Sequence, residues 1–448
     1  MAESPDPSGL LTGLIDRARR AGADTCDAVF VQSASLSHAR RLGKLEKLER
    51  AESSDLGLRV FIGRRQAILS STDMSARALD ELVARAIAMA RVVPEDPYCG
   101  LAEPGDITKV PPPDLDMEDA AEPAAERLVE LAAAAEDAAL AIKGVTNSEG
   151  ADAGWGRTRV ALAASNGFTG QYAMTHHSLS VAVLAGSGTG MERDYDFCTT
   201  VHGGDMLDAA TLGRNAGERA VARLNPRKVK TAAVPVVFDR RAAGGLLGHL
   251  SGAINGAAIA RGTSFLKDKL GKPVFRHGIN VVDDPHRKRG LRSKPFDAEG
   301  IANTRRALIE DGNLTTWLLD LRSSRQLQLA STGHASRGTG GPPSPSPTNL
   351  YLEAGHVTPG ELMDDIRQGF LVTELMGMGV NGVTGDYSRG ATGFWIENGK
   401  PAYPVSEVTI AGNLKDMYLN LYPANDLEFR RGTDAPTLRI EGMTVAGK

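Results

Sequence analysis

The chain has 448 residues, of which 42% are hydrophobic and 24% charged, a balance typical of a soluble globular protein that is too long for one hydrophobic core. Its 51 Lys and Arg residues against 55 Asp and Glu residues give a formal net charge of -4. A nucleic-acid-binding protein usually carries a basic surplus, so this charge argues against direct contact with nucleic acid.

The amino-terminal segment 1–8 lacks the basic region and apolar run of a signal peptide. No stretch approaches about 18 consecutive apolar residues, so we expect no membrane-spanning helix. The three cysteines, Cys26, Cys99 and Cys198, lie far apart and form no pair with metal-ligand spacing. Idle thiols suit a reducing compartment, and we expect a cytoplasmic protein.

The first 98 residues predict a helix, an antiparallel sheet and a second helix. Apolar residues at helical spacing follow Ser8, and Gly22 can end that helix. Residues 56–62 alternate between apolar and other side chains, as in a strand, and residues 79–87 return to helical spacing. We therefore predict an amino-terminal α/β domain over residues 1–98.

A Pro-rich segment, residues 98–116, denies the backbone regular hydrogen bonding and predicts a stiff linker. Beyond it, residues 124–142 and 206–224 have helical spacing. The dipeptide Asn166–Gly167 between two apolar stretches indicates a hairpin, because both residues accept positive φ. We predict a middle α/β segment over residues 118–226 that packs with the first domain.

From Val234 onward the pattern favours strands and long loops. Asp311–Gly312 and Asn398–Gly399 are hairpin signatures, and residues 331–349 form a Gly/Pro-rich loop that is too long for a simple connection. Residues 234–448 therefore predict a β-rich, barrel-like carboxy-terminal domain. The expected fold class is α+β.

A metallopeptidase helix commonly carries two histidines one turn apart and a glutamate, because zinc needs imidazoles on one face and its water needs a base. The comparable stretch here, residues 243–255, holds only His249 and no acidic residue. A packed helix histidine is the simpler interpretation. His334 and His356 flank the Pro-rich loop and leave open a divergent site with His249.

Other enzyme motifs are absent or lack their context. Residues 377–382 match the dinucleotide fingerprint Gly-x-Gly-x-x-Gly, but no helical pattern follows, so a bend in a sheet is favoured. The adjacent His176 and His177 would point to opposite faces of a strand and could not share a metal. Neither a nucleophile elbow nor a P-loop is present.

Four segments resemble the TldD/PmbA family, in which a TldD-type subunit pairs with a TldE (PmbA-type) subunit. They are residues 55–62, 244–249, 261–265 and 386–399, and the resemblance continues through residues 403–416 and 441–443 in family order. It implies an amino-terminal α/β layer, a middle α/β segment and a β-barrel-like carboxy-terminal domain.

In the TldD-type subunit, the resemblance implies two histidines and a glutamate on one helix and a cysteine near the carboxy terminus as the zinc site. This chain offers only His249 and no cysteine after Cys198. It therefore resembles the PmbA/TldE side.

The implied role is that of a subunit without its own zinc in a heterodimeric zinc metallopeptidase, with zinc in the TldD-type partner. The implied substrates are unfolded peptides, such as peptide antibiotic precursors and antitoxins. The family is also described as modulating DNA gyrase. The net negative charge of this chain argues against direct contact with DNA, so we expect any such effect to be indirect.

We expect His249, His334, Asn381 and Tyr387 to line the peptide chamber of such a complex. A different class of function, a stand-alone peptide-binding or scaffold protein that forms a homodimer, remains open. So does an independent hydrolase built on the scattered histidines.

Overall fold

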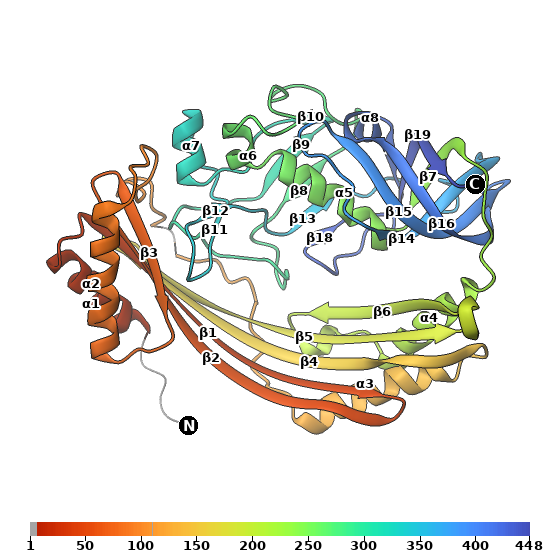
Figure 1. Ribbon diagram of the computed structural model, residues 1–448, viewed down its shortest axis with the longest axis horizontal. Coiled ribbons are helices and arrows are strands. Elements are labelled where there is room, and N and C mark those ends of the chain that lie inside the picture. Colours follow the sequence, from red (N-terminus) through yellow and green to blue (C-terminus); the bar gives the residue numbers. More distant parts are fainter. Residues whose placement is uncertain (1–6, 110) are drawn as a thin grey trace.

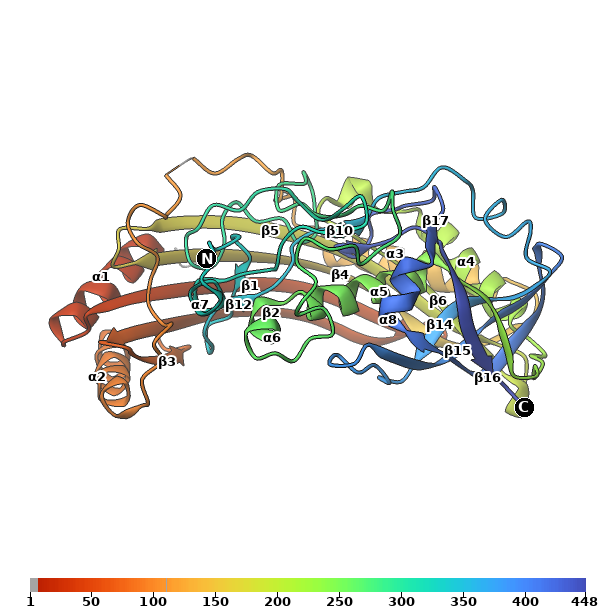
Figure 2. The same ribbon diagram turned by 90° about the horizontal axis from the view of Figure 1, so that it is seen from above.

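A long curved sheet forms one side of the molecule, and a second unit that contains a barrel lies over its concave face (Figure 1). The computed structural model describes residues 7–109 and 111–448. Seen from above, the long strands run beneath the second unit along the long axis of the molecule (Figure 2). The α+β fold class is confirmed.

The first sheet has six antiparallel strands in the order β3-β2-β1-β4-β5-β6. They are β1 (Thr25–Arg41), β2 (Lys44–Ile62), β3 (Arg65–Ser71), β4 (Val145–Ala164), β5 (Thr169–Ala185) and β6 (Glu192–Thr200). Strand β1 pairs with β4 from Asp27 to Arg40, so the ranges 1–98 and 118–226 contribute to one sheet. The predicted hairpin at Asn166–Gly167 joins β4 to β5, and Gly167 has a φ of +98°.

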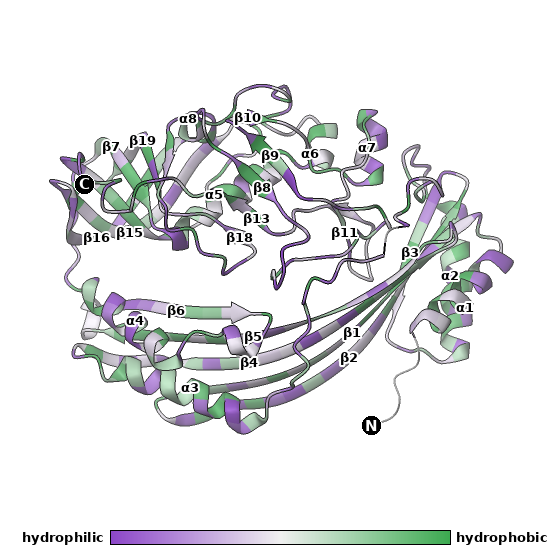
Figure 3. Ribbon diagram, turned by 180° about the vertical axis from the view of Figure 1, so that it is seen from behind, coloured by the Kyte–Doolittle hydropathy of each residue, from purple (hydrophilic) through white to green (hydrophobic). Residues whose placement is uncertain are grey.

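Two pairs of helices cover the convex face of this sheet, one pair at each end (Figure 1). They are α1 (Pro7–Arg20), α2 (Ala76–Val92), α3 (Ala125–Leu140) and α4 (Ala209–Ala222), with short 3-10 turns η1 (Gly188–Gly190) and η2 (Gly203–Asp205). Each pair buries its apolar face against the strands in a separate hydrophobic core. Along the long strands hydrophobic and hydrophilic residues alternate (Figure 3), as a sheet covered on one face requires.

The carboxy-terminal unit contains a closed barrel. Its strands are β7 (Ala232–Phe238), β14 (Gln368–Met376), β15 (Asp386–Glu397), β16 (Lys400–Asn413) and β19 (Leu438–Ala446), with β17 (Leu421–Pro423) beside β19. The barrel closes because β16 pairs with both β15 and β19. The barrel-like carboxy-terminal domain is thus confirmed.

The rest of this unit consists of short elements around the barrel. A second sheet contains β8 (Val281–Asp283), β9 (Arg306–Glu310), β10 (Asn313–Leu314), β13 (Leu350–Leu352) and β18 (Thr433–Asp434). A two-stranded pair contains β11 (Ala335–Ser336) and β12 (Ser344–Pro345), and the helices are α5 (Arg240–Ala253), α6 (Gly256–Ala260), α7 (Leu321–Leu327) and α8 (Leu414–Leu419). Asp311–Gly312 and Asn398–Gly399 form the hairpins predicted for them.

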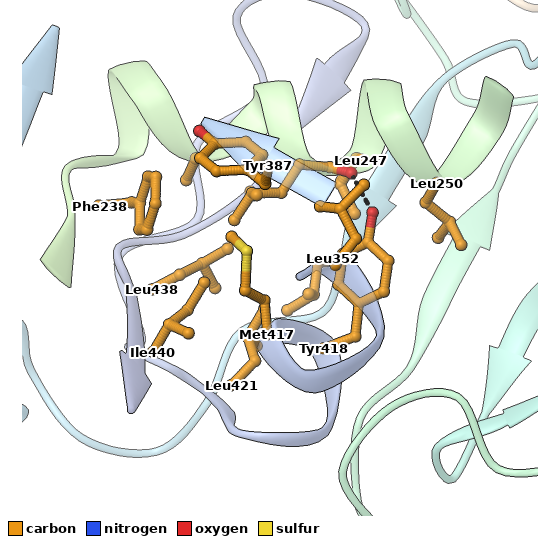
Figure 4. Close-up of a cluster of buried hydrophobic side chains, with 14 of the residues drawn as sticks. Phe238, Leu247, Leu250, Leu352, Tyr387, Met417, Tyr418, Leu421, Leu438 and Ile440 are labelled. Atoms are coloured by element: carbon orange, nitrogen blue, oxygen red, sulfur yellow. Dashed lines mark hydrogen bonds between the residues drawn. The ribbon is translucent and has the colours of Figure 1, made fainter. Parts of the chain in front are cut away.

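Helix α5 packs on the barrel through the largest hydrophobic core (Figure 4). Its Leu247 and Leu250 are buried there, and the Tyr418 hydroxyl donates a hydrogen bond to the Leu246 carbonyl at 2.9 Å. Burying each such leucine contributes about 1.5–3 kcal/mol. The position of α5 is therefore fixed by the barrel.

Buried polar contacts join the two units at both ends of the sheet. At one end Asp27 of β1 pairs with Arg337 and with Arg59, whose Nε lies 3.0 Å from the Asp27 carboxylate. Nearby, a Cβ atom at Gly57 would lie 2.3 Å from the Thr339 carbonyl oxygen, so only glycine permits this approach. Of the helices in residues 7–109 and 111–448, none has both the length and the apolar composition that crossing a membrane requires.

Candidate functional site

Helix α5 presents two different faces. It begins after strand β7, where the Asp239 side chain accepts a hydrogen bond from the Arg241 amide at 2.8 Å and caps the helix. One face is buried in the barrel core. The other carries Gly245 and Gly252, where an added Cβ atom would meet nothing within 4 Å. His249 stands one turn from each of these glycines, on the open face.

The neighbours of His249 are an aromatic ring and a cation. Its imidazole meets the Tyr387 ring edge-to-face, with the ring centroids 5.9 Å apart. Burial lowers the pKa of His249, and the positive charge of Arg389 lowers it further. The imidazole is therefore held neutral, with one nitrogen that donates and one that accepts.

Tyr387 lies on β15, beside α5 in Figure 4. Its side chain is buried, and within the described residues its hydroxyl has no hydrogen-bond partner. Burial raises the pKa of Tyr387 well above its ordinary value of 10. A buried hydroxyl without a partner is costly, so this one is a candidate donor to a bound group.

Asn381 lies in the exposed loop 377–385 between β14 and β15. Its backbone amide donates to the Asp386 carbonyl, and its side-chain oxygen accepts from the Val383 amide at 2.9 Å. The neighbouring Val380 forms an isolated bridge with Tyr387. The structure therefore brings His249 and Tyr387 together and places Asn381 on the adjoining loop. No helix follows residues 377–382, as expected for a bend.

His334 lies in a different place, inside the second unit. It is buried, its Nδ1 lies 2.8 Å from the Thr332 hydroxyl, and its Nε2 lies 3.3 Å from the Asp283 carboxylate. These contacts give it a structural environment separate from that of His249. His356 is exposed on the surface.

Two buried carboxyl groups near His334 carried no recognisable sequence signal. Burial raises the pKa of Asp297, against the opposing effect of three backbone amides that donate to it. Burial and the Asp297 charge raise the pKa of Glu299, whose Oε2 accepts from the Leu321 amide at 2.8 Å. Only the fold reveals them, because their burial depends on β11 and α7.

A cavity of about 250 Å³ lies between strand β6 and the second unit. Thr199 and Thr200 line it from the sheet, and Asn349 lines it from the opposite side. The Arg287 guanidinium at its wall stacks over the Phe429 ring at 3.4 Å. This polar space adjoins the seam between the two units.

Potential metal ligands are scattered. Among residues 7–109 and 111–448, no three His, Cys, Asp or Glu side chains are grouped so that they could hold a metal ion. Cys26 is buried, and desolvation raises the pKa of its thiol to about 12, so it stays protonated.

The chain matches all three domains of one family along its length. Residues 26–90 match PmbA/TldA metallopeptidase domain 1, residues 118–224 match the central domain, and residues 231–447 match the C-terminal domain. Metalloprotease PmbA of Escherichia coli O157:H7 is 39% identical over 428 residues, which cover 95% of this chain and 93% of that protein. The chain belongs to the PmbA/TldD metallopeptidase family. Within that family it is of the PmbA/TldE type, as the sequence resemblance predicted.

Solved structures of other proteins share this fold. A protein from Bacteroides thetaiotaomicron, named as a modulator of DNA gyrase, superposes with a TM-score of 0.91 at 27% identity, covering 99% of this chain and all of that one. TldE from Thermococcus kodakarensis has a TM-score of 0.87 at 20% identity, with 97% and 99% covered, and shows the fold alone. His249, Tyr387 and Asn381 all lie within the family's C-terminal domain.

Proposed function

We propose that this chain is the subunit without catalytic metal in a heterodimeric TldD/TldE zinc metallopeptidase. The observation that carries the proposal is the setting of His249 on α5. A catalytic zinc needs three protein ligands, usually imidazole and carboxylate groups on neighbouring turns. Here the single imidazole faces the Tyr387 ring and the cationic Arg389. These residues do not fit a hydrolytic zinc ion, because Arg389 repels a cation and Tyr387 is held protonated.

Membership of a metallopeptidase family supports a role in proteolysis, and several relatives are named as metalloproteases. A role in proteolysis is compatible with the poor fit of the His249 surroundings to zinc if a TldD-type partner supplies the zinc. This chain then supplies part of the peptide-binding surface. The three free cysteines fit a complex that works in the reducing cytoplasm.

The residues around α5 suit the binding of a peptide backbone. The open glycine face lets a chain approach the helix closely, and the neutral His249 can both donate to and accept from a peptide group. Loop 377–385 adds exposed apolar side chains, since Met378 is 89% exposed and Val383 is 56% exposed. An extended peptide can use these groups, whereas a folded domain hides its backbone. Unfolded peptides are therefore the proposed substrates, and the family resemblance adds peptide antibiotic precursors and antitoxins to the proposal.

The test compares the chain alone with its mixture with a TldD-type subunit from the same source. Bound zinc is measured by mass spectrometry of the metal, and cleavage of an unstructured peptide is followed by chromatography. We expect zinc and cleavage only in the mixture. A His249→Ala variant should still associate with the partner and should raise the KM for the peptide.

Two results would contradict the proposal. Stoichiometric zinc together with cleavage by the chain alone would show an independent hydrolase. Failure of the two subunits to associate, with peptide still bound by the lone chain, would show the stand-alone peptide-binding or scaffold protein.

A further inference from the structure

Strand β2 has a free edge over half of its length. Its residues 56–62 pair with β3, whereas residues 44–53 lie beyond the end of β3 and all are exposed. The inner edge of residues 44–53 pairs with β1, as far as Lys44. Within the described chain no strand covers the outer edge of residues 44–53, so their outward backbone groups can pair with another chain.

Exposed leucines mark the same hairpin. Leu42, Leu45 and Leu48 are 50%, 64% and 51% exposed. Leu42 has a positive φ of 49° at the turn, and the other two lie on the free edge. Large apolar side chains on an unpaired strand edge are a liability for a monomer and are typical of a contact surface.

The charges of this edge are ordered so that the strand complements itself. Residues 46–50 read Glu-Lys-Leu-Glu-Arg. If a second copy runs antiparallel with Leu48 opposite Leu48, Lys47 lies opposite Glu49 and Glu46 lies opposite Arg50. Each charge of residues 46–50 then lies opposite a charge of the other sign.

Neighbouring registers are disfavoured by like charges. A shift of one residue in one direction places Lys47 opposite Arg50, and a shift in the other places Glu46 opposite Glu49. A two-residue shift places either Glu49 opposite itself or Lys47 opposite itself. The β-bulge of this hairpin lies at Glu46, outside the central pairs of residues 47–49. One register is therefore selected.

We propose that two copies of this chain pair through the β2 edge over residues 46–50, with a two-fold axis at Leu48. The two six-stranded sheets then form one continuous sheet, and the interface is isologous, with the same residues on both sides. Main-chain hydrogen bonds and the leucine contact provide affinity, while the charge order fixes the register. The pairing concerns the chain by itself and stands whether or not the proposed function holds.

Charge variants at the centre of the edge test this pairing in the full-length chain by sedimentation equilibrium. Wild type is expected to be a dimer at micromolar concentration. Glu49→Lys places two lysines opposite each other at both symmetric positions, and Lys47→Glu places two glutamates there. Each variant should raise the dissociation constant Kd of the dimer by about tenfold or more. The double variant Lys47→Glu/Glu49→Lys restores opposite charges and should restore the dimer, as should mixing the two single variants.

The matched control is Glu81→Lys on the exposed face of α2, which should leave the dimer unchanged. Far-ultraviolet circular dichroism confirms that the variants are folded, since residues 47 and 49 are both exposed. A monomeric wild type would overturn the proposal, because the charged residues of the edge would then prevent β2 from pairing with another chain. A dimer that persists in Glu49→Lys, or that the double variant fails to restore, would also overturn it.

Discussion

Arg241 in the first turn of α5 donates a hydrogen bond to the Asp194 carboxylate on β6 at 2.7 Å. Asp194 is buried, and Arg223 at the end of α4 lies 3.4 Å from the same carboxylate. Burial alone would raise the pKa of Asp194, but the Arg241 hydrogen bond and charge hold it below its ordinary value. The helix that carries His249 is thereby tied to the first sheet.

Replacing Asp194 with Ala should destabilise the protein strongly. Both guanidinium groups would keep their charge and lose a buried partner, which costs about 3–5 kcal/mol of unfolding free energy. Urea denaturation measures the change. The control is Glu81→Ala, which removes an exposed ion pair with Arg77 and should cost less than about 0.5 kcal/mol. Equal losses in the two variants would contradict the role given to Asp194.

Replacing Arg389 with Gln should raise the pKa of His249, because it removes the positive charge that disfavours the imidazolium. The remaining burial should still keep this pKa below its ordinary value of 6.5. Proton NMR titration of the histidine ring measures both values. The same variant of Arg276, which stacks on Tyr422, serves as the control. An unchanged His249 titration in Arg389→Gln would show that the two groups are not coupled.

The depressed pKa of His249 also sets the sign of its pH effect. The unfolded chain takes up a proton near pH 6.5, whereas the folded protein resists it. This group therefore stabilises the fold above that pH, and its contribution is lost as the pH falls below it.

Glu299→Gln should flatten the dependence of stability on pH in the neutral range. Burial and Asp297 raise the pKa of Glu299 to about 8, whereas the unfolded chain loses this proton near 4.5. The native protein therefore becomes less stable as the pH rises from 4.5 towards 8. Gln keeps an acceptor for the Leu321 amide and cannot ionise, so the variant should be more stable than wild type at pH 8.

The measurement is the unfolding free energy from urea titrations at pH 5 and pH 8. Glu130→Gln on the exposed face of α3 is the control and should follow the wild-type curve. If Glu299→Gln loses as much stability as wild type between these pH values, Glu299 is not the titrating group.

Gly245→Ala should stabilise the protein by about 0.5–1 kcal/mol, because alanine favours a helix over glycine and the added methyl group meets no atom within 4 Å. The neighbouring Gly244→Ala is the matched control. Its Cβ atom would lie 2.9 Å from the Thr433 carbonyl oxygen, so it should destabilise the protein. Thermal unfolding of both variants decides the point, and a loss of stability in Gly245→Ala would show that this face of α5 is not open.

Local features of the fold followed from the sequence where the signal was short-range. The hairpins at Asn166–Gly167 and Asn398–Gly399 formed as predicted, because Gly167 and Gly399 accept the positive φ that a tight turn requires. Helix α5 and its single histidine were expected from the comparison of residues 243–255 with a metallopeptidase helix, not from residue spacing. The aromatic contact between His249 and Tyr387 was not, since these residues are far apart in the chain.

Long-range pairing carried no comparable signal. Nothing local to β1 indicates that it pairs with β4 across a Pro-rich linker. Residues 286–292 are rich in Lys and Arg and carry no local sign of a partner, but Arg289 pairs with Asp116 and Asp205 at the seam between the two units. Such contacts depend on how the sheet and the second unit meet, which residue spacing does not encode.

The position of β7 in the barrel has a consequence for the order of folding. This strand, residues 232–238, lies between β14 and β19, and β19 ends at residue 446. During synthesis the first sheet can form once β6 has left the ribosome, but β7 must wait for residues 438–446 before its second neighbour arrives. Helix α5 leaves the ribosome before most of the barrel strands, and the barrel on which it packs closes only after β19 has been made. A nascent chain therefore holds the His249 helix on an open, unfinished barrel until residues 438–446 have emerged.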